Sequence, residues 1–223
     1  MQAMGDLWTK RWQRAIDAAK RRGARDYGLE IDRPATTSEV EEVERAIGRP
    51  LPQPFRRTLL EFSRRVDFFW FLLPQDDQTP ERWKGVWCGG CRWDIGQLAR
   101  MDEEARWLST NAFVEDTPDE TIWRDKLPFH AIASGDYIAI DVSSGDPQPV
   151  VYLSHDFDYS HGHVLGGDFF DFMDRWTALG CPDDDIWPLF VPEKRGGIDL
   201  AGSNAVAWCE WFGVPPGHAI RDE

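Results

Sequence analysis

The sequence GDYIAIDVSSGDPQPVVYL, residues 135–153, decides the fold, because it reads as two β-strands joined by a turn. Isoleucine and valine occupy every second position of residues 137–142, which is the period of a strand with two different faces. The SSGDP segment, residues 143–147, consists of turn-forming residues. Residues 150–153 (VVYL) supply the partner strand. We therefore expect an antiparallel hairpin in the middle of the fold.

Upstream of this hairpin, the apolar period changes to that of helices. Residues 7–25 predict an amphipathic helix with tryptophans on one face and basic side chains on the other. In a second helix, Ser38 and Glu41 have the spacing of a capping box. Gly48 is expected to end that helix in the left-handed conformation. A proline-bearing elbow then leads into a third helix, whose apolar positions continue to Val66.

The other segments predict short strands and one closing helix. Helices first, an antiparallel meander next and a closing helix define the α+β class. We expect an N-terminal helical hairpin packed on an antiparallel, or mixed, β-sheet, with a C-terminal helix that closes the domain. The expected strands are residues 68–73, 86–87, 93–95 and 127–132, and the expected helices are residues 97–107 and 168–179, the last capped by Asp168.

The 223 residues include 39 acidic and 25 basic side chains, a formal net charge of −14. Residues 1–65 hold 14 basic and 10 acidic side chains, whereas residues 66–223 hold 11 and 29. Residues 66–223 are so acidic that they repel the phosphate backbones of nucleic acids. This charge argues against direct nucleic-acid binding and favours a basic protein partner. No apolar run approaches the ~20 residues of a membrane span. The N-terminus shows no signal-peptide pattern, so we expect a cytoplasmic location.

Three segments, in this order along the chain, carry a family resemblance. In SEVEEVERAIGRPLPQPF, residues 38–55, a helix with glutamates and a terminal glycine runs into Leu-Pro. The second segment, residues 127–156, contains LPF, then GDYIAID, then VVYLSHD. The third is FFDFM, residues 169–173. Together they resemble the SUKH superfamily over about residues 37–180, with Ser134 where a glycine is usual.

The resemblance implies an α+β domain without catalytic residues, so we expect no enzyme activity and no cofactor. Bacterial members of the superfamily are immunity proteins that bind and neutralise toxin domains, often nucleases, and eukaryotic relatives are cell-wall regulators or adaptors. We expect residues 1–36 to form a basic amphipathic helix and lead-in, residues 37–180 the SUKH-like domain, and residues 181–223 an extension packed on it. The signature residues that shape the fold are Glu44, Gly48, Leu51, Pro52, Gly135 and Asp136.

The Trp87-to-Cys91 segment (WCGGC) has the Cys-x-x-Cys spacing of redox sites and of half a zinc site. A redox site needs a helix that starts inside the motif, but the following residues look extended. The other two cysteines, Cys181 and Cys209, do not form a second such pair. We therefore expect a structural turn at Cys88 and Cys91.

Residues 155–163 hold the richest set of metal-ligand side chains. They favour a metal-dependent hydrolase as the alternative from another functional class. The segment nevertheless follows the hairpin as a loop, and loops are commonly polar. The candidate ligands are His155, Asp156, Asp158, His161 and His163.

Two acidic loops lie beside aromatic residues. Aromatic anchors surrounded by carboxylates suit the recognition of a partner rich in lysine and arginine. We therefore expect a non-catalytic immunity protein whose acidic face covers the basic cleft of a toxin, with a regulatory adaptor of a cellular protein as the alternative. The candidate partner-binding residues are Glu115, Asp116, Asp119, Glu120, Trp123, Asp183, Asp184, Asp185 and Trp187.

Overall fold

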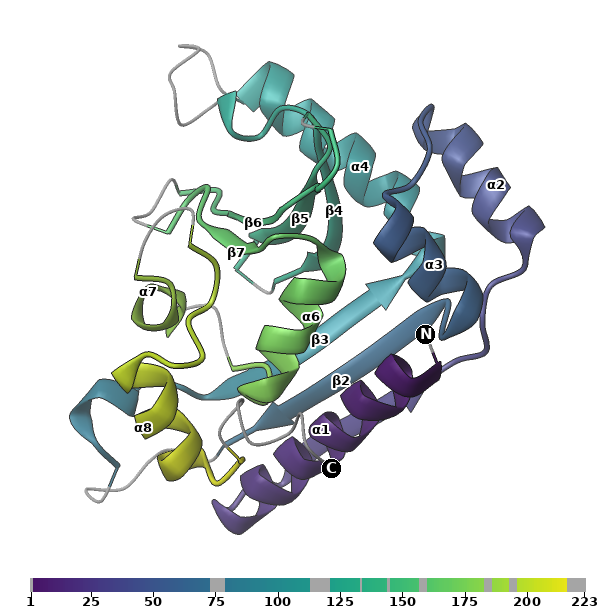
Figure 1. The fold of residues 1–223 in the computed structure, drawn as a ribbon. Helices are drawn as coiled ribbons and strands as arrows, with labels where there is room; N and C mark the ends of the chain where they lie inside the picture. Colours follow the sequence, from purple (N-terminus) through teal and green to yellow (C-terminus); the bar gives the residue numbers. More distant parts are fainter. Residues whose placement is uncertain are drawn as a thin grey trace.

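Helices surround two antiparallel sheets in this protein, which confirms the α+β class (Figure 1). The computed structural model describes residues 2–72, 79–112, 121–132, 134–143, 145–156, 160–182, 186–192 and 196–215. The helices are α1 (Gln2–Arg21), α2 (Thr37–Ile47), α3 (Gln53–Glu61), α4 (Leu98–Trp107), α6 (Phe169–Ala178), α7 (Trp187–Phe190) and α8 (Ser203–Phe212). The strands are β1 (Asp26–Ile31), β2 (Arg65–Phe71), β3 (Cys88–Asp94), β4 (Lys126–Ala131), β5 (Tyr137–Asp141), β6 (Val150–Leu153) and β7 (Val164–Gly166). Short helical turns are η1 (Glu81–Trp83), η2 (Ile95–Gln97) and η3 (Leu108–Ala112).

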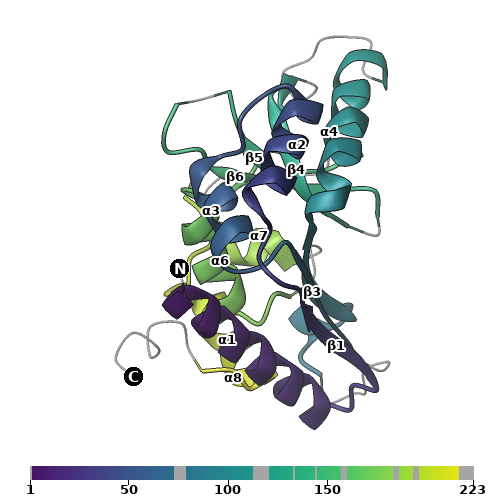
Figure 2. The same cartoon turned by 90° about the vertical axis from the view of Figure 1, so that its right-hand side faces the viewer.

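The first sheet has the strand order β1-β2-β3, and both pairings are antiparallel. Val66, Phe68 and Trp70 alternate along β2 and are buried on the face that packs against α1. There the ring of Trp12 stacks on Phe68, with 5.8 Å between centroids. Figure 2 shows α1 running alongside β1 on that side of the sheet.

The second sheet has the order β4-β5-β6-β7 and contains the predicted hairpin, which β5 and β6 confirm. One of its faces joins the main core, where Phe129 packs edge-on against Phe169 and Phe172 of α6. The other face packs with residues of α4 and with Trp123, through Ala139, Val151 and Leu153. The second sheet is therefore covered on both faces.

The predicted helical hairpin is confirmed as α2 and α3, but its N-cap lies two residues earlier than expected. Thr36, not Ser38, is the N-cap residue of α2, and its side chain forms a capping box with Glu39. The backbone of Thr36 is extended, as an N-cap requires, whereas Ser38 is already inside the helix. At the other end, Gly48 adopts φ +74°, as predicted.

Three further elements differ from the prediction. Val66 belongs to β2, since α3 ends at Glu61. The expected pair of short strands around Gly89 and Gly90 is one continuous strand, β3. The two glycines fit within it because other groups approach their backbone closely: a Cβ on Gly89 would lie 2.2 Å from the Cys181 carbonyl oxygen. The first 36 residues contain a strand, β1, that the sequence pattern did not indicate.

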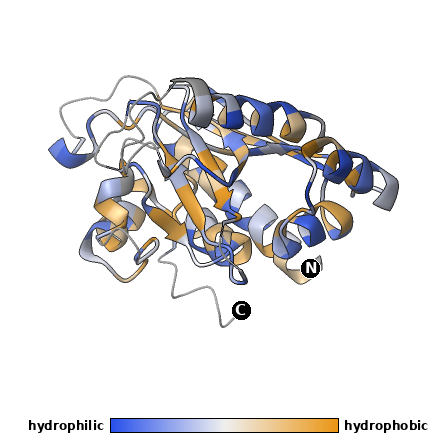
Figure 3. Cartoon of the chain, turned by 90° about the horizontal axis from the view of Figure 1, so that it is seen from above, coloured by the Kyte–Doolittle hydropathy of each residue, from blue (hydrophilic) through white to orange (hydrophobic). Residues whose placement is uncertain are grey.

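Apolar and polar residues are distributed as this architecture requires. Figure 3 shows helices with alternating hydrophilic and hydrophobic residues at the outside of the fold. Their apolar sides face a core that includes Trp8, Trp12, Trp93 and Trp208, each at most 2% exposed. Many of the aromatic side chains are therefore used for packing.

Candidate functional site

The predicted acidic loops lie outside the described residues, apart from their aromatic neighbours. Trp187 begins α7. Trp123 is 1% exposed, and its ring meets Tyr137 edge-on at 6.1 Å. In this structure Trp123 is therefore a packing residue of the second sheet, and its ring is not offered to a partner. The predicted role of Glu115, Asp116, Asp119, Glu120, Asp183, Asp184 and Asp185 stays a prediction.

Asp136 accepts hydrogen bonds from several directions at the entry to β5. The Ser134 and Tyr152 hydroxyls donate to its Oδ2, both at 2.7 Å. The His155 backbone N–H donates to its Oδ1 at 2.8 Å, and His155 Nδ1 lies 2.7 Å from the same oxygen. Burial by itself would raise the pKa of Asp136, but these hydrogen bonds outweigh it and hold the pKa below its ordinary value. Gly135, at φ +102°, forms the turn that precedes it. Asp136 thus ties the β5–β6 hairpin to the segment after β6.

The elbow between α2 and α3 depends on Glu44. Its carboxylate accepts a hydrogen bond from the Leu51 backbone N–H at 3.0 Å and another from Arg56 Nε at 3.1 Å. Leu51 is buried, and Pro52 stands at the N-cap of α3. These contacts, with those of Asp136, are those expected of residues that determine the fold.

The predicted metal-ligand segment is arranged differently from a metal site. His161 Nδ1 accepts the Ser154 backbone N–H at 3.0 Å, and His155 Nδ1 is bonded to Asp136. His155 Nε2 lies 3.2 Å from a carboxylate oxygen of Asp156. Within the described ranges, no group of three His, Cys, Asp or Glu side chains is placed to hold a metal ion; Asp158 falls outside those ranges. His161 lies in a turn and His163 directly precedes β7, within the loop expected after the hairpin.

Cys88 and Cys91 are three positions apart on a strand, so their side chains point to opposite faces of the first sheet. The Cys91 thiol faces the core, 3.8 Å from Met173 Sδ. Nearby, burial raises the pKa of the Cys181 thiol well above its ordinary value, and the neighbouring Cys91 adds to the shift. This arrangement is that of packed thiols rather than of a Cys-x-x-Cys turn.

The face of the first sheet opposite α1 carries exposed side chains in the described part of the chain. We call it the open sheet face, and no described helix buries it. Phe71 remains 42% exposed there, and Phe69 lies over Gly28, where an added Cβ would be 2.7 Å from its ring. The face consists of Asp26, Gly28, Glu30, Arg65, Asp67, Phe69, Phe71, Cys88, Gly90, Arg92 and Asp94.

The open sheet face is aromatic at one end and charged at the other. Phe69 and Phe71 are neighbours, with ring centroids 5.8 Å apart, and the Arg92 guanidinium lies over Phe69 at 5.5 Å. Arg92 also forms an ion pair with Asp67 at 2.6 Å. Four carboxylates and two guanidiniums occupy the face, so its charge is negative.

Arg65 makes only long ion pairs on this face. Its nearest carboxylate oxygens lie 3.3 Å away on Glu30, 3.7 Å on Asp67 and 3.9 Å on Asp94. Its side chain is 45% exposed. Exposed pairs of this length add little to stability, so they hold the Arg65 side chain only weakly.

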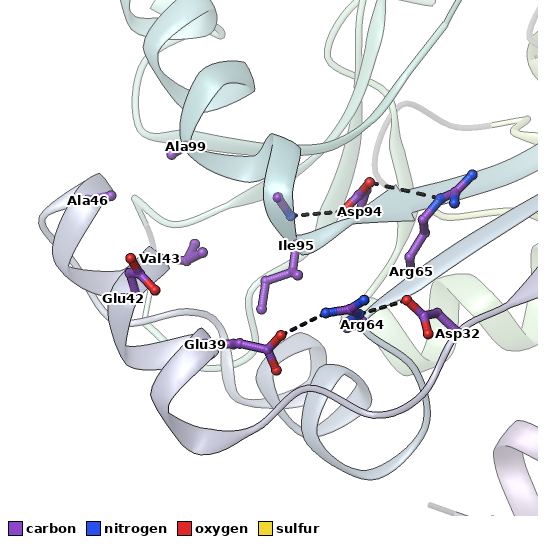
Figure 4. Close-up of a pocket in the computed structure, with 11 residues that line it drawn as sticks. Asp32, Glu39, Glu42, Val43, Ala46, Arg64, Arg65, Asp94, Ile95 and Ala99 are labelled. Atoms are coloured by element: carbon purple, nitrogen blue, oxygen red, sulfur yellow. Dashed lines mark hydrogen bonds and ion pairs between the residues drawn. The ribbon is translucent and has the colours of Figure 1, made fainter.

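A cavity of about 580 Å³ adjoins the charged end, between α2 and the start of α4 (Figure 4). Val43, Ala46 and Ala99 form its apolar wall. Glu42 stands at the same wall and makes no ion pair among the described residues. The cavity therefore combines an apolar wall with a carboxylate open to a ligand.

The floor of this cavity is a cluster of ion pairs. Arg64 donates to Asp32 at 2.7 Å and to Glu39 at 2.8 Å (Figure 4). Glu39 also accepts two hydrogen bonds from Arg33 and one from the Thr36 backbone. The hydrogen bond from Arg33, followed by that from Thr36, holds the pKa of Glu39 well below its ordinary value. The same carboxylate thus caps α2 and fixes it over the sheet.

The open sheet face is not among the features predicted from the sequence. Residues 68–73 were expected to form a strand that is apolar throughout, although RVDFFWF, residues 65–71, alternates between two sets of positions. Val66, Phe68 and Trp70 face the core, and the residues between them form the open face. The alternation over residues 65–71 is the signal of a strand with one solvated face.

The helical elbow, the covered hairpin with its buried Asp136 and the two sheets define an α+β domain of the SUKH type. The chain belongs to the SMI1/KNR4 family (SUKH-1), whose model matches residues 34–175, more than half of the chain. A search of curated proteins gives no significant match. None of the helices described here is long and apolar enough to span a bilayer.

Proposed function

We propose that this chain is a bacterial immunity protein that binds and neutralises a toxin domain, in the cytoplasm and without catalysis. Family membership supports a function of this kind. The main support for the position of the binding site is the open sheet face, because aromatic rings and carboxylates are exposed there beside a cavity. The open sheet face and the α2–α4 cavity together form the proposed binding surface.

The chemistry of this surface suits a basic partner. Phe71 offers apolar area, which is the kind of anchor that contributes most to protein interfaces. The surrounding carboxylates attract lysine and arginine, and the net charge of −14 adds a long-range field that speeds association. A toxin whose active cleft binds nucleic acid has the required positive charge, and occupying that cleft would block it.

The α2–α4 cavity suits one long basic side chain of the partner. The aliphatic part of an arginine or lysine would lie along Val43 and Ala99, and its charged end would reach Glu42. This arrangement offers a specific pocket next to a broad apolar patch, as in interfaces with a few dominant residues.

Co-purification with the product of the neighbouring reading frame tests the proposal. A tight one-to-one complex that silences a toxic neighbour is expected, and the absence of both complex and toxicity contradicts the immunity function. Phe71→Ala should weaken the affinity by about tenfold or more. Trp107→Ala is the matched control, since Trp107 is an exposed aromatic residue, 58% exposed, at the end of α4. If Trp107→Ala weakens binding and Phe71→Ala does not, the open sheet face is the wrong surface.

A second pair of variants tests the cavity. Glu42→Lys should weaken toxin binding by about tenfold, because it places a positive charge where the partner's basic side chain would bind. Glu41→Lys changes the net charge equally but lies outside the cavity wall. Equal effects of both variants would show that only the overall charge matters.

The predicted acidic loop of residues 115–120 gives a separate test. Charge reversal at Asp116, Asp119 and Glu120 is expected to slow association with the toxin at low salt. An unchanged association rate would remove this loop from the binding surface.

A further inference from the structure

β1 lies at the edge of the first sheet, and hydrogen bonds on either side of β2 show which of its groups face outward. The Leu72 N–H donates to the Trp87 carbonyl at 2.7 Å, so even-numbered residues of β2 bond to β3. Odd-numbered residues of β2 must then bond to β1, as the bond from the Asp32 N–H to the Arg65 carbonyl at 3.0 Å shows. In the antiparallel register, these partners on β1 are its even-numbered residues.

The N–H and C=O groups of Tyr27, Leu29 and Ile31 therefore point away from the sheet. No hydrogen bond to these groups occurs among the residues that the structure describes. The side chains of Tyr27 and Ile31 are also 39% and 37% exposed. β1 thus offers a row of main-chain donors and acceptors with apolar side chains beside it.

The opposite edge of the same sheet is satisfied. The outward N–H of Gly90 donates to the Cys181 carbonyl at 2.9 Å, and that of Arg92 donates to His130 Nδ1 at 2.9 Å. Natural proteins protect free edges with proline, lysine, bulges or short strands. β1 has six residues and contains neither proline nor lysine, and its two charged residues, Asp26 and Glu30, are both acidic. Its edge therefore disfavours an acidic strand but not a basic one.

We propose that β1 accepts an extended segment of the partner as a fourth strand of the first sheet, and that this segment alternates apolar and basic residues. Apolar side chains of the added strand would lie beside Tyr27, Leu29 and Ile31. Its basic side chains would lie beside Asp26 and Glu30 on the open sheet face, which they would extend. This inference rests on the proposed function and specifies how the toxin is held.

A second copy of this chain is a poorer occupant. Antiparallel pairing of two β1 strands about Leu29 sets Asp26 opposite Asp32 of the second copy, and Arg25 opposite Arg33 of the second copy. Like charges directly opposite each other destabilise strand pairing, and two bodies of charge −14 repel each other. The charge pattern therefore favours a basic partner strand.

A capped seven-residue peptide of alternating lysine and valine is the probe for this inference. Amide hydrogen exchange of the full chain should show new protection at Tyr27, Leu29 and Ile31, while Gly28 and Glu30, already bonded within the sheet, stay unchanged. A peptide N-methylated at its valines, whose N–H groups would face β1, and a peptide with glutamate in place of lysine are the controls. Lack of protection at millimolar peptide, or equal protection by the N-methylated peptide, overturns the proposal.

Variants of β1 provide the second measurement. Leu29→Pro removes an outward N–H that the fold does not use, so peptide affinity should fall by about tenfold, the effect of one or two lost hydrogen bonds. Leu29→Ala controls for the side chain. If Leu29→Pro fails to fold, the double variant Asp26→Lys/Glu30→Lys is the deciding test. It should lower the affinity for the lysine peptide by about fivefold or more and raise the affinity for the glutamate peptide. If the affinities for both peptides stay the same, the proposal is contradicted. A dimer formed through β1, detected by light scattering, also contradicts it.

The peptide measurement needs no toxin, so its failure leaves the immunity function standing. If the neighbouring gene product forms a complex, hydrogen exchange in that complex gives the direct test. Protection of the outward β1 amides supports strand addition, and unchanged exchange there overturns it even though the toxin is bound.

Discussion

The two sheets of this protein are both antiparallel, yet they are packed in different ways. The second sheet lies between α6 and α4, and all four residues of β6 are buried. The first sheet packs one face against α1, and no described helix covers the other, where Phe71 and Arg65 are exposed. The signature residues Gly135 and Asp136 stand at the entry to the covered sheet. We infer that the covered sheet maintains the fold and that the open sheet meets the partner.

The family match sharpens this division. It covers residues 34–175, which include both sheets apart from β1. The edge strand and α1 therefore precede the part of the chain that the family shares. A binding edge outside the shared domain would let this chain recognise a partner of its own without changing the common core.

The largest expected difference between the two sheets is in the free energy of unfolding that each loses when a phenyl ring is removed. Phe129→Ala removes a buried ring from β4 and should lower the free energy of unfolding by about 4 kcal/mol. Phe71→Ala on the open sheet face should cost about 1 kcal/mol or less, because that ring is 42% exposed. Denaturant unfolding of both variants measures the difference. Similar losses would mean that the open face is structural.

The second contrast concerns two carboxylates. Asp136→Asn disrupts a buried cluster of hydrogen bonds and should cost about 3 kcal/mol. Asp67→Asn, on the open sheet face, alters only half-exposed ion pairs and should cost about 0.5 kcal/mol. Chemical denaturation at neutral pH compares them. Equal costs would contradict the structural role given to Asp136.

The same carboxyl predicts a pH dependence. Because the pKa of Asp136 is lower in the folded protein than in the unfolded chain, the folded state holds its proton less tightly. Its contribution to stability is therefore complete at neutral pH and declines as the pH falls below about 4. Unfolding free energies measured from pH 7 to pH 2 should fall less steeply in Asp136→Asn than in the parent chain. Parallel curves would assign the acid sensitivity to other carboxyls.

The smallest expected effect distinguishes two possible helix caps. Thr36→Ala should destabilise the protein by about 1 kcal/mol, since Thr36 accepts the Glu39 N–H at the start of α2. Ser38→Ala should change stability by less than about 0.5 kcal/mol. Thermal unfolding of the two single variants is sufficient. The reverse order would restore the cap position that the sequence pattern predicted.

Local patterns predicted much of this fold. The alternation in residues 137–142 and the turn that follows predicted β5 and β6, and Asp168 correctly marked the start of α6. These signals work because each depends on neighbours a few residues apart. β1 has no such signal: DYGLEI contains a glycine and two acidic residues and forms a strand because β2 pairs with it.

The candidate site was predictable only in part. The acidic character of the chain follows from its composition, but composition does not show which aromatic rings are exposed to solvent. Trp123, expected beside a binding loop, packs against the second sheet, whereas Phe71, read as part of a buried strand, is exposed. Which face of a strand meets water depends on what packs there, and that packing involves segments far apart in the sequence.

Short-range periodicity and turn residues are enough to predict the α+β class, the helical elbow at Gly48, the central hairpin and the family. Three features follow only from the folded arrangement of the described residues: the first sheet has one open face, β1 has a free edge, and Cys88 and Cys91 point to opposite sides. Each of these depends on contacts between distant segments: α1 covers one face of the first sheet, and residues 181–182 complete one of its edges.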